Sequence, residues 1–178
     1  MKSTLIDSQS QSENKSKLSI RHATEADMPA VFGLVKELAE FERVPQQVET
    51  SVEQYLKDGF GAIPWFRCLV AETEAKEIIG MAFYYFGYST WKGRMLYLED
   101  FMVRRSHRRQ GIGRQLIDTL VQIGLEENIQ LMKWEVIEWN EGAKAMYRSM
   151  GGELDGEWIN VKLQRSQLEK RGVGSRLE

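Results

Sequence analysis

The sequence is poor in cysteine and histidine, with only Cys68, His22 and His107 in 178 residues. A single cysteine excludes a disulfide within the chain and a zinc site built from several thiolates. Two histidines far apart in sequence do not form a histidine-rich metal centre either. We therefore expect a protein that works without a bound metal.

Long apolar runs and an excess of basic charge are also missing. No stretch approaches the ~20 apolar residues that span a bilayer, and no apolar signal region is present near residue 1. Lysine and arginine total 24 against 26 aspartate and glutamate, for a net charge of −2 and a pI of about 5.9. This balance argues against nucleic-acid binding. We expect a cytoplasmic protein with neither membrane nor nucleic-acid partners.

Length and composition predict one folded domain. The 178 residues are 42% hydrophobic, which is enough for a sizeable core. Residues 1–17 are polar and are expected to form a disordered leader. We place the folded domain at residues 18–164, followed by a C-terminal helix or tail at 165–178.

The first half of the domain reads as a strand, two helices and two hairpins. Asp27 is a candidate helix cap, Pro29 fits a first helical turn, and apolar residues follow at helical spacing. Ser51 and Gly59 mark the ends of a second helix. The expected strands are 18–22, 66–72, 78–88 and 95–103, of which the last three form antiparallel hairpins.

The second half alternates helix and strand. We expect helices at 111–127 and 140–150 and strands at 131–139 and 158–163. Short links between such elements imply a parallel portion of the sheet. The predicted fold class is therefore α/β (α+β), with a mixed, mostly antiparallel central sheet flanked by helices.

The most specific local motif is Arg108-Arg109-Gln110-Gly111-Ile112-Gly113, between a predicted strand and a predicted helix. Glycines let the backbone approach a ligand closely, and a helix N-terminus presents unpaired N–H groups with a partial positive charge. Together with nearby arginines (Arg104, Arg105 and Arg114) they form a cradle for a pyrophosphate. On spacing alone, a glycine-rich turn with solvated arginines explains the motif equally well. The Walker and dinucleotide patterns fit worse, because Arg114 follows Gly113 and a third spaced glycine is missing.

At these residues the sequence resembles the GNAT acetyltransferase superfamily, whose pyrophosphate motif is Arg-x-x-Gly-x-Gly between a strand and a helix. The order of elements from 18 to about 163 is similar to the GNAT fold. Asn140, with Ala143 or Ala145 and Tyr147 behind it, is similar to the second family motif. Other shared segments match the spermidine/spermine and thialysine acetyltransferase branch; they are residues 37–42, 58–61, 68–72, 89–94, 97–101 and 138–141.

The resemblance implies that acetyl-CoA is the co-substrate and that its acetyl group passes directly to the primary amine of a small molecule in a ternary complex. Backbone N–H groups near Phe101–Val103 would stabilise the oxyanion, where the strand separates from its neighbour. It also implies a homodimer. The implied cofactor-binding residues are Phe101, Met102, Val103, Arg108, Arg109, Gln110, Gly111, Ile112, Gly113, Arg114, Asn140 and Tyr147.

Acetyl transfer to an amine requires a base, because an alkylammonium has a pKa near 10.4 and its neutral form costs roughly 4–5 kcal/mol at pH 7. Glu99 and Asp100 are adjacent on a predicted strand, so we expect them to face opposite ways. From the residues alone, a half-buried acid paired with an arginine or lysine is the favoured role of Glu99, since structural ion pairs also place carboxylates this way. The resemblance selects Glu99 as the substrate-side base.

The leaving thiolate requires a donor. Tyr147 follows Asn140 by seven residues, so both lie near one helical face. A tyrosine there is commonly a packing residue; the resemblance makes Tyr147 the acid that donates to the departing sulfur. Cys68 lies among apolar residues with no histidine near it in sequence, and we expect it to be inert.

The acceptor is expected to contact Phe41, Glu42, Ser89, Trp91 and Glu99, positions that match the branch. Polyamine enzymes carry an acid where this sequence has Ser89, and Ser-Thr-Trp is similar to thialysine-type members instead. For an amino-acid acceptor, Lys92 or Arg94 could pair with the substrate carboxylate. Two alternatives stay open: a protein or peptide N-acetyltransferase, and a non-catalytic module that binds acyl-CoA.

Overall fold

The computed structural model describes residues 18–172. The predicted leader, 1–17, and the last six residues of the predicted tail lie outside this range. The chain divides into two compact units, one ending at Glu135 and one beginning at Val136. None of the helices between residues 18 and 172 is long and apolar enough to cross a membrane.

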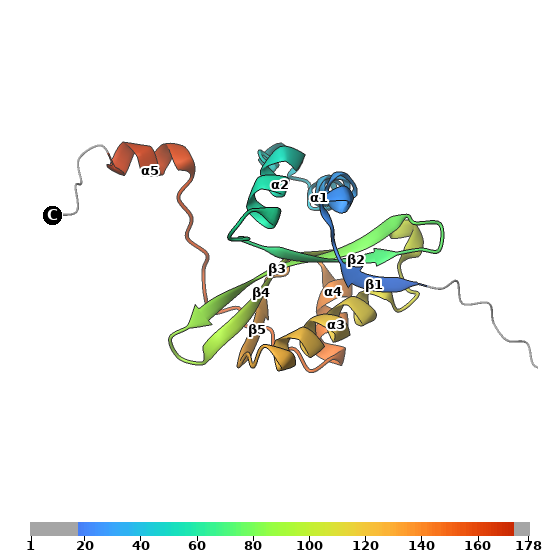
Figure 1. Cartoon of the computed structure of the whole chain (residues 1–178). Helices are drawn as coiled ribbons and strands as arrows, with labels where there is room; N and C mark the ends of the chain where they lie inside the picture. Colours follow the sequence, from blue (N-terminus) through green and yellow to red (C-terminus); the bar gives the residue numbers. More distant parts are fainter. Residues whose placement is uncertain (1–17, 173–178) are drawn as a thin grey trace, which may run out of the picture. The chain divides into compact units, whose positions relative to one another are not determined.

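The first unit is built on one mixed, mostly antiparallel sheet, which confirms the predicted fold class (Figure 1). Antiparallel pairing joins each of the first three strands to the next, and the last strand runs parallel to the fourth. The strands, in spatial and sequence order, are β1 (Ser19–His22), β2 (Arg67–Glu72), β3 (Ile78–Ser89), β4 (Gly93–Val103) and β5 (Leu131–Trp134).

Helices α1 (Met28–Phe41) and α2 (Val52–Phe60) cover one face of the sheet (Figure 1). Ser51 caps α2 as predicted, because its side chain accepts a hydrogen bond from the Gln54 N–H at 3.2 Å. Short 3₁₀ turns precede the two helices, at Glu25–Asp27 and Pro45–Gln47. The core on this face joins buried residues of α1 to those of the strands; they include Met28, Val31, Leu34, Cys68, Val70, Met81 and Met102.

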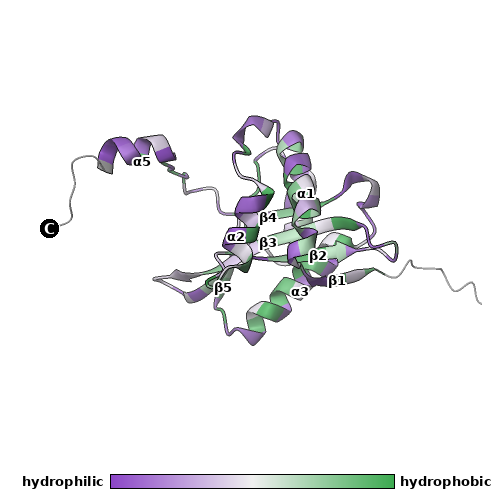
Figure 2. Cartoon of the chain, turned by 45° about the horizontal axis from the view of Figure 1, so that its top comes forward, coloured by the Kyte–Doolittle hydropathy of each residue, from purple (hydrophilic) through white to green (hydrophobic). Residues whose placement is uncertain are grey.

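Helix α3 (Ile112–Glu126) packs on the opposite face and carries the crossover from β4 to β5. Its buried residues Leu116 and Leu120 are fully covered. Gly80 on β3 permits this close packing, since a Cβ there would lie 3.1 Å from the Met102 carbonyl oxygen and 3.4 Å from Leu116 Cδ1. Apolar residues accordingly concentrate on the strands and on the helices packed against them (Figure 2).

The second unit contains α4 (Glu141–Ser149) and α5 (Arg165–Gly172). Helix α4 begins at Asn140, whose side chain accepts a hydrogen bond from the Ala143 N–H at 3.2 Å. Gly151 lies just past the end of the helix, and its φ of +84° places it in the left-handed region that favours glycine. Helix α5 is almost wholly hydrophilic (Figure 2).

Two predicted strands differ from the structure. The strand expected at 131–139 ends at Trp134, because its register with β4 stops at Leu98. The segment 158–163 forms no strand in the described chain, and Ile159 and Val161 are 90% and 91% exposed. Alternating apolar residues produce a strand only where a neighbour supplies ladder hydrogen bonds.

Asp27 stands at the start of α1, as predicted, but its carboxylate does not cap that helix. It accepts hydrogen bonds from both Arg21 guanidinium nitrogens Nη1 and Nη2, at 2.7 and 2.9 Å, and from the Thr24 N–H at 2.7 Å. Arg21 also donates to buried Glu72, from Nε at 3.0 Å. One guanidinium thus joins β1, β2 and the start of α1 through two carboxylates.

Removing the Asp27 charge is expected to destabilise the fold in a pH-dependent way. The hydrogen bond from Arg21 holds the pKa of Asp27 well below its usual range. Its stabilising effect is therefore complete above the unfolded pKa near 3.9 and decreases as the pH falls below that value. We expect Asp27→Asn to lower the free energy of unfolding by about 2 kcal/mol at pH 7.

Urea unfolding at pH 7 and at pH 3 measures this effect, and the difference between the two proteins should shrink at the lower pH. Glu74→Gln, on the exposed turn after β2, is the control charge removal and should change stability by less than about 0.5 kcal/mol. A constant deficit of Asp27→Asn across this pH range would contradict the ionic explanation.

Candidate active site

A β-bulge in β4 defines the centre of the candidate site. Tyr84 on β3 pairs with Leu98, whereas the preceding residue, Phe83, pairs with Asp100. Glu99 is therefore an extra residue with no partner opposite it on β3. Such a bulge interrupts the strict alternation of side chains along the strand.

The bulge places Glu99 and Asp100 on the same face of the sheet, which corrects the prediction that they face opposite ways. Asp100 is paired with Phe83, a residue of the core beneath α1 and α2. Glu99 follows Tyr97 by two residues on this face, and its negative charge acts on both Asp100 and Tyr97. Sequence reasoning did not select Asp100, because nothing in the residue pattern marks the extra residue.

Three carboxylates form what we call the acidic cluster: Glu42 at the end of α1, with Glu99 and Asp100 on β4. Burial, followed by the charges of Glu99 and Glu42, raises the pKa of Asp100 to about 6. Burial also raises the pKa of Glu42. Burial disfavours the charged forms of Asp100 and Glu42, and the neighbouring negative charges add to this effect for Asp100, so a cationic ligand that offsets these effects would bind favourably here.

The acidic cluster lies where β4 separates from β5. Parallel pairing between these strands covers Met95–Leu98 and Leu131–Trp134 and stops there. From Asp100 to Val103, β4 keeps β3 as its ladder partner while β5 supplies none. The open edge of Phe101–Val103 therefore presents backbone N–H groups next to the carboxylates.

The predicted anion cradle connects β4 to α3. Arg109 and Gly111 adopt left-handed conformations, with φ of +65° and +80°. Gly111 occupies the N-cap position of α3, and no side chain caps the helix. The first N–H groups of α3, from Ile112 onward, therefore remain available to an anion.

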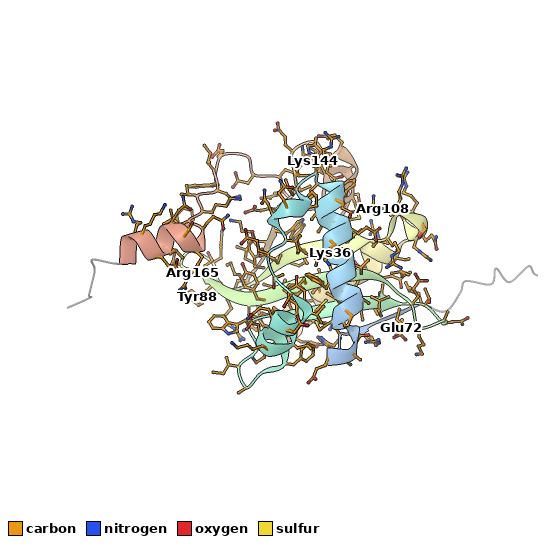
Figure 3. All side chains as sticks on the ribbon, turned by 90° about the horizontal axis from the view of Figure 1, so that it is seen from above. Lys36, Glu72, Tyr88, Arg108, Lys144 and Arg165 are labelled. Carbon is orange, nitrogen blue, oxygen red and sulfur yellow. The ribbon has the colours of Figure 1, made fainter. Side chains whose placement is uncertain are left out.

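The arginines around the cradle take different roles. Arg108 donates from Nε to the Val103 carbonyl at 2.9 Å, and its guanidinium lies over the Phe41 ring at 5.1 Å from the ring centre. Figure 3 shows Arg108 beside α1. Arg109 and Arg114 are exposed. Arg104, expected to contribute to the cradle, instead forms ion pairs with Glu77 and Glu37.

The contact between Arg108 and Phe41 brings together a residue predicted to bind the pyrophosphate and a residue predicted to contact the acceptor. Phe41 and its neighbour Glu42 were expected to contact the acceptor, and Arg108 to bind the pyrophosphate. The end of α1 thus lies beside the start of the cradle, and Glu42 is near enough to Asp100 for its charge to raise the pKa of that group.

Ser89 and Trp91 lie at the tip of the β3–β4 hairpin. Tyr88, the residue before Ser89, is labelled in Figure 3. The Ser89 hydroxyl accepts hydrogen bonds from the Trp91 and Lys92 N–H groups at 3.3 and 3.2 Å, which fixes the turn. Trp91 is 82% exposed. Glu99 lies six positions after Gly93, so the tip is roughly 20 Å along β4 from the acidic cluster. The chain by itself does not bring these two residues to the cluster.

Asn140 and Tyr147 belong to the second unit. The Asn140 side chain caps α4, as described above, and Tyr147 is 5% exposed. Burial raises the pKa of Tyr147 to about 12, so its hydroxyl stays protonated at neutral pH. Cys68, by contrast, is buried in the core with a pKa raised by burial to about 12, which agrees with the expectation that it is inert.

Comparison with known proteins matches this architecture. The model of the acetyltransferase (GNAT) family matches residues 33–151. Thialysine N-epsilon-acetyltransferase of Mus musculus is 38% identical over 162 residues, which cover 85% of this chain and 95% of that protein. The spermidine/spermine N(1)-acetyltransferase-like protein 1 of Homo sapiens is 37% identical over 158 residues, 84% of this chain and 23% of that protein.

Solved structures share the fold at low sequence identity. An integron cassette protein from V. cholerae superposes with a TM-score of 0.71 and 22% identity, over 87% of this chain and 97% of that chain. An aminoglycoside acetyltransferase from an uncultured soil sample, in complex with sisomicin, gives a TM-score of 0.69 and 21% identity over 83% of this chain and 97% of that chain.

Proposed function

The chain belongs to the acetyltransferase (GNAT) family, and from that premise we propose that it transfers the acetyl group of acetyl-CoA to the primary amine of a small cationic molecule. The relatives named above support an N-acetyltransferase that acts on small amines. The observation that carries the proposal is the acidic cluster at the point where β4 leaves β5.

In this proposal the acidic cluster binds and deprotonates the acceptor. Glu42 and Asp100 attract the ammonium group, and its binding favours their charged forms. Glu99 is the general base, which takes the proton directly or through one water molecule. The exposed position of Glu99 on the bulge lets it face an incoming ligand.

The residues of the first unit fit acetyl-CoA, which supplies the acetyl thioester. The uncapped N-terminus of α3 and the left-handed Gly111 suit a pyrophosphate, with Arg109, Gln110, Gly113 and Arg114 around it. The open edge of Phe101–Val103 offers N–H groups to the pantetheine arm and to the oxyanion that develops on the carbonyl. Attack by the neutral amine is direct, in a ternary complex.

The second unit supplies the acid. Tyr147 keeps its proton at neutral pH, so its hydroxyl can donate to the sulfur as the thiolate departs. Asn140 holds the first turn of α4 and thereby fixes the helix that carries Tyr147. We assign both residues to acetyl-CoA binding as well.

For the acceptor, we favour an amino acid of the thialysine type over a polyamine. The relatives that match most of their own length are thialysine acetyltransferases, and Ser89 replaces the acid of polyamine enzymes with a turn-forming hydroxyl. Arg94, considered as a partner for the acceptor carboxylate, is 3.4 Å from Glu127. Lys92 is the remaining candidate for that role.

A thiol-release assay with acetyl-CoA tests the proposed function. The acceptors are thialysine, lysine, putrescine, spermidine and a lysine-containing peptide, each also supplied as its N-acetylated form as a blank. We expect turnover of thialysine to exceed that of the diamines and of the peptide. Preference for the peptide would favour a protein acetyltransferase. Binding of coenzyme A, seen as a rise in Tm, without turnover of any amine would favour the non-catalytic module.

We also propose that the protein is a homodimer. Tyr88 and Trp91 are 71% and 82% exposed at the tip of the β3–β4 hairpin, and large exposed aromatic residues are typical of interaction surfaces. Light scattering of the purified chain measures the mass directly. A mass of one chain would contradict the dimer without affecting the proposed chemistry.

A further inference from the structure

Two stacked tyrosines lie on the same face of the sheet as Glu99. Tyr85 on β3 and Tyr97 on β4 are directly opposite each other, and their rings stack with centres 5.2 Å apart and planes 22° apart. Pairing of β2 with β3 ends at Tyr84, so the stack lies on the part of the hairpin that extends past β2. The strands that pair in this region are β3, β4 and β5.

Each tyrosine has its own carboxylate. The Tyr97 hydroxyl donates to Glu135, which directly follows β5, at 3.1 Å. Glu99, displaced by the bulge, is the diagonal neighbour of Tyr85 across the strand pair, a separation that long side chains bridge. The remaining charged side chain on this face of β5 is Lys133, which is opposite Tyr97 in the parallel register and is exposed.

We infer that Tyr85 is a positioning residue for the reaction: its hydroxyl donates to the Glu99 carboxylate and, braced by the Tyr97 ring, holds that carboxylate toward the acceptor amine. The inference rests on the proposed role of Glu99 as the base. It extends that role to β3, the strand beside the one that carries Glu99.

The physical need for such a residue comes from the bulge. Glu99 lacks a partner on β3, and its side chain is exposed. An exposed glutamate samples several rotamers, which a single hydrogen bond from a fixed donor reduces. The stack supplies that fixed donor, because aromatic rings in contact hold each other in place. Burial first, and then the charge of Glu99, raises the pKa of Tyr85, which keeps its hydroxyl a donor.

Tyr85→Phe tests the inference because it removes the hydroxyl and keeps the stacked ring. We expect kcat/KM for the preferred amine to fall about tenfold at pH 7, the size of one hydrogen bond to a charged group. The acidic limb of the pH profile should move up by about one pH unit, since a donor to a carboxylate favours its charged form. The KM for acetyl-CoA should not change.

Tyr97→Phe is the matched control. It keeps the same stack and removes only the hydrogen bond to Glu135. We expect its acidic limb to coincide with that of the wild type. An equal shift in both variants, or no shift in Tyr85→Phe, would overturn the inference, because the hydroxyl of Tyr85 would then have no particular effect on the base.

A second measurement does not depend on turnover. In protein labelled with ¹³C at the tyrosine Cζ, the Tyr85 resonance is the one that disappears in Tyr85→Phe. Its titration should move to lower pH in Glu99→Gln, because the neighbouring negative charge is gone. An unchanged titration would refute the contact between the two side chains. Full activity of Glu99→Gln with a shifted titration would instead refute the proposed function and leave the contact intact.

Discussion

Glu99→Gln is expected to lower kcat/KM for the acceptor amine by about 100- to 1,000-fold at pH 7, the range for loss of a general base. Glutamine has nearly the same shape, but it cannot accept the proton of an ammonium group. The KM for acetyl-CoA should stay within about twofold, because the anion cradle and the open edge of β4 are untouched. Steady-state kinetics with both substrates varied provides the measurement.

The difference in kcat/KM between Glu99→Gln and the wild type should shrink as the pH rises. An alkylamine with a pKa near 10.4 gains a tenfold larger neutral fraction for each pH unit below that value. A variant without the base depends on this free neutral amine, so its rate should rise toward that of the wild type between pH 7 and pH 10. A constant deficit across this range would show that Glu99 holds the acceptor rather than deprotonating it.

Asp100→Asn is the control for the choice of carboxylate. Asp100 shares the face and the acidic cluster with Glu99, and its pKa of about 6 makes it the other plausible base by charge alone. In our assignment Asp100 attracts the ammonium, so its loss should raise the KM for the amine more than it lowers kcat. A larger fall in kcat for Asp100→Asn than for Glu99→Gln would assign the base to Asp100.

The elements that sequence patterns predicted correctly are those with strong local signals. Helix α1 follows from apolar residues at helical spacing, and the β2–β3–β4 hairpins from aromatic and branched residues between turns. The predictions for the C-terminal end of β5 and for the segment 158–163 were wrong for one reason. Whether an alternating apolar segment forms a strand depends on a neighbour that is remote in sequence, and no local pattern reports that neighbour.

In the candidate site, too, the features with a local sequence signal were predicted and those that depend on remote neighbours were not. The cradle was predictable because its glycines and its helix start are adjacent in sequence, and Gly111 indeed has a positive φ. The shared face of Glu99 and Asp100 was not predictable, since it depends on one unpaired residue in the register of β3 with β4. The ion pairs of Arg104 could not be predicted from the sequence either, because Glu37 and Glu77 belong to other parts of the chain.

Tyr147→Phe is expected to lower kcat about 100-fold, the lower range for loss of a general acid. The proposed acid must hold its proton until the thiolate departs, and burial raises the pKa of Tyr147 to about 12. The activity of the wild-type enzyme should therefore show no loss at alkaline pH from ionisation of Tyr147 below about pH 11. The KM for acetyl-CoA and the dependence on the acceptor amine should change little, because the ring remains in place.

Tyr84→Phe is the matched control for this substitution. Tyr84 is fully buried, and its hydroxyl lies near the Arg67 guanidinium. The same loss of a buried phenol oxygen there should leave kcat unchanged, since Tyr84 faces α3 on the side of the sheet away from the acidic cluster. Comparable Tm values in the two variants with a 100-fold difference in kcat would identify Tyr147 as the acid. If kcat and Tm fall together in Tyr147→Phe, the residue supports packing, and water must protonate the leaving thiolate.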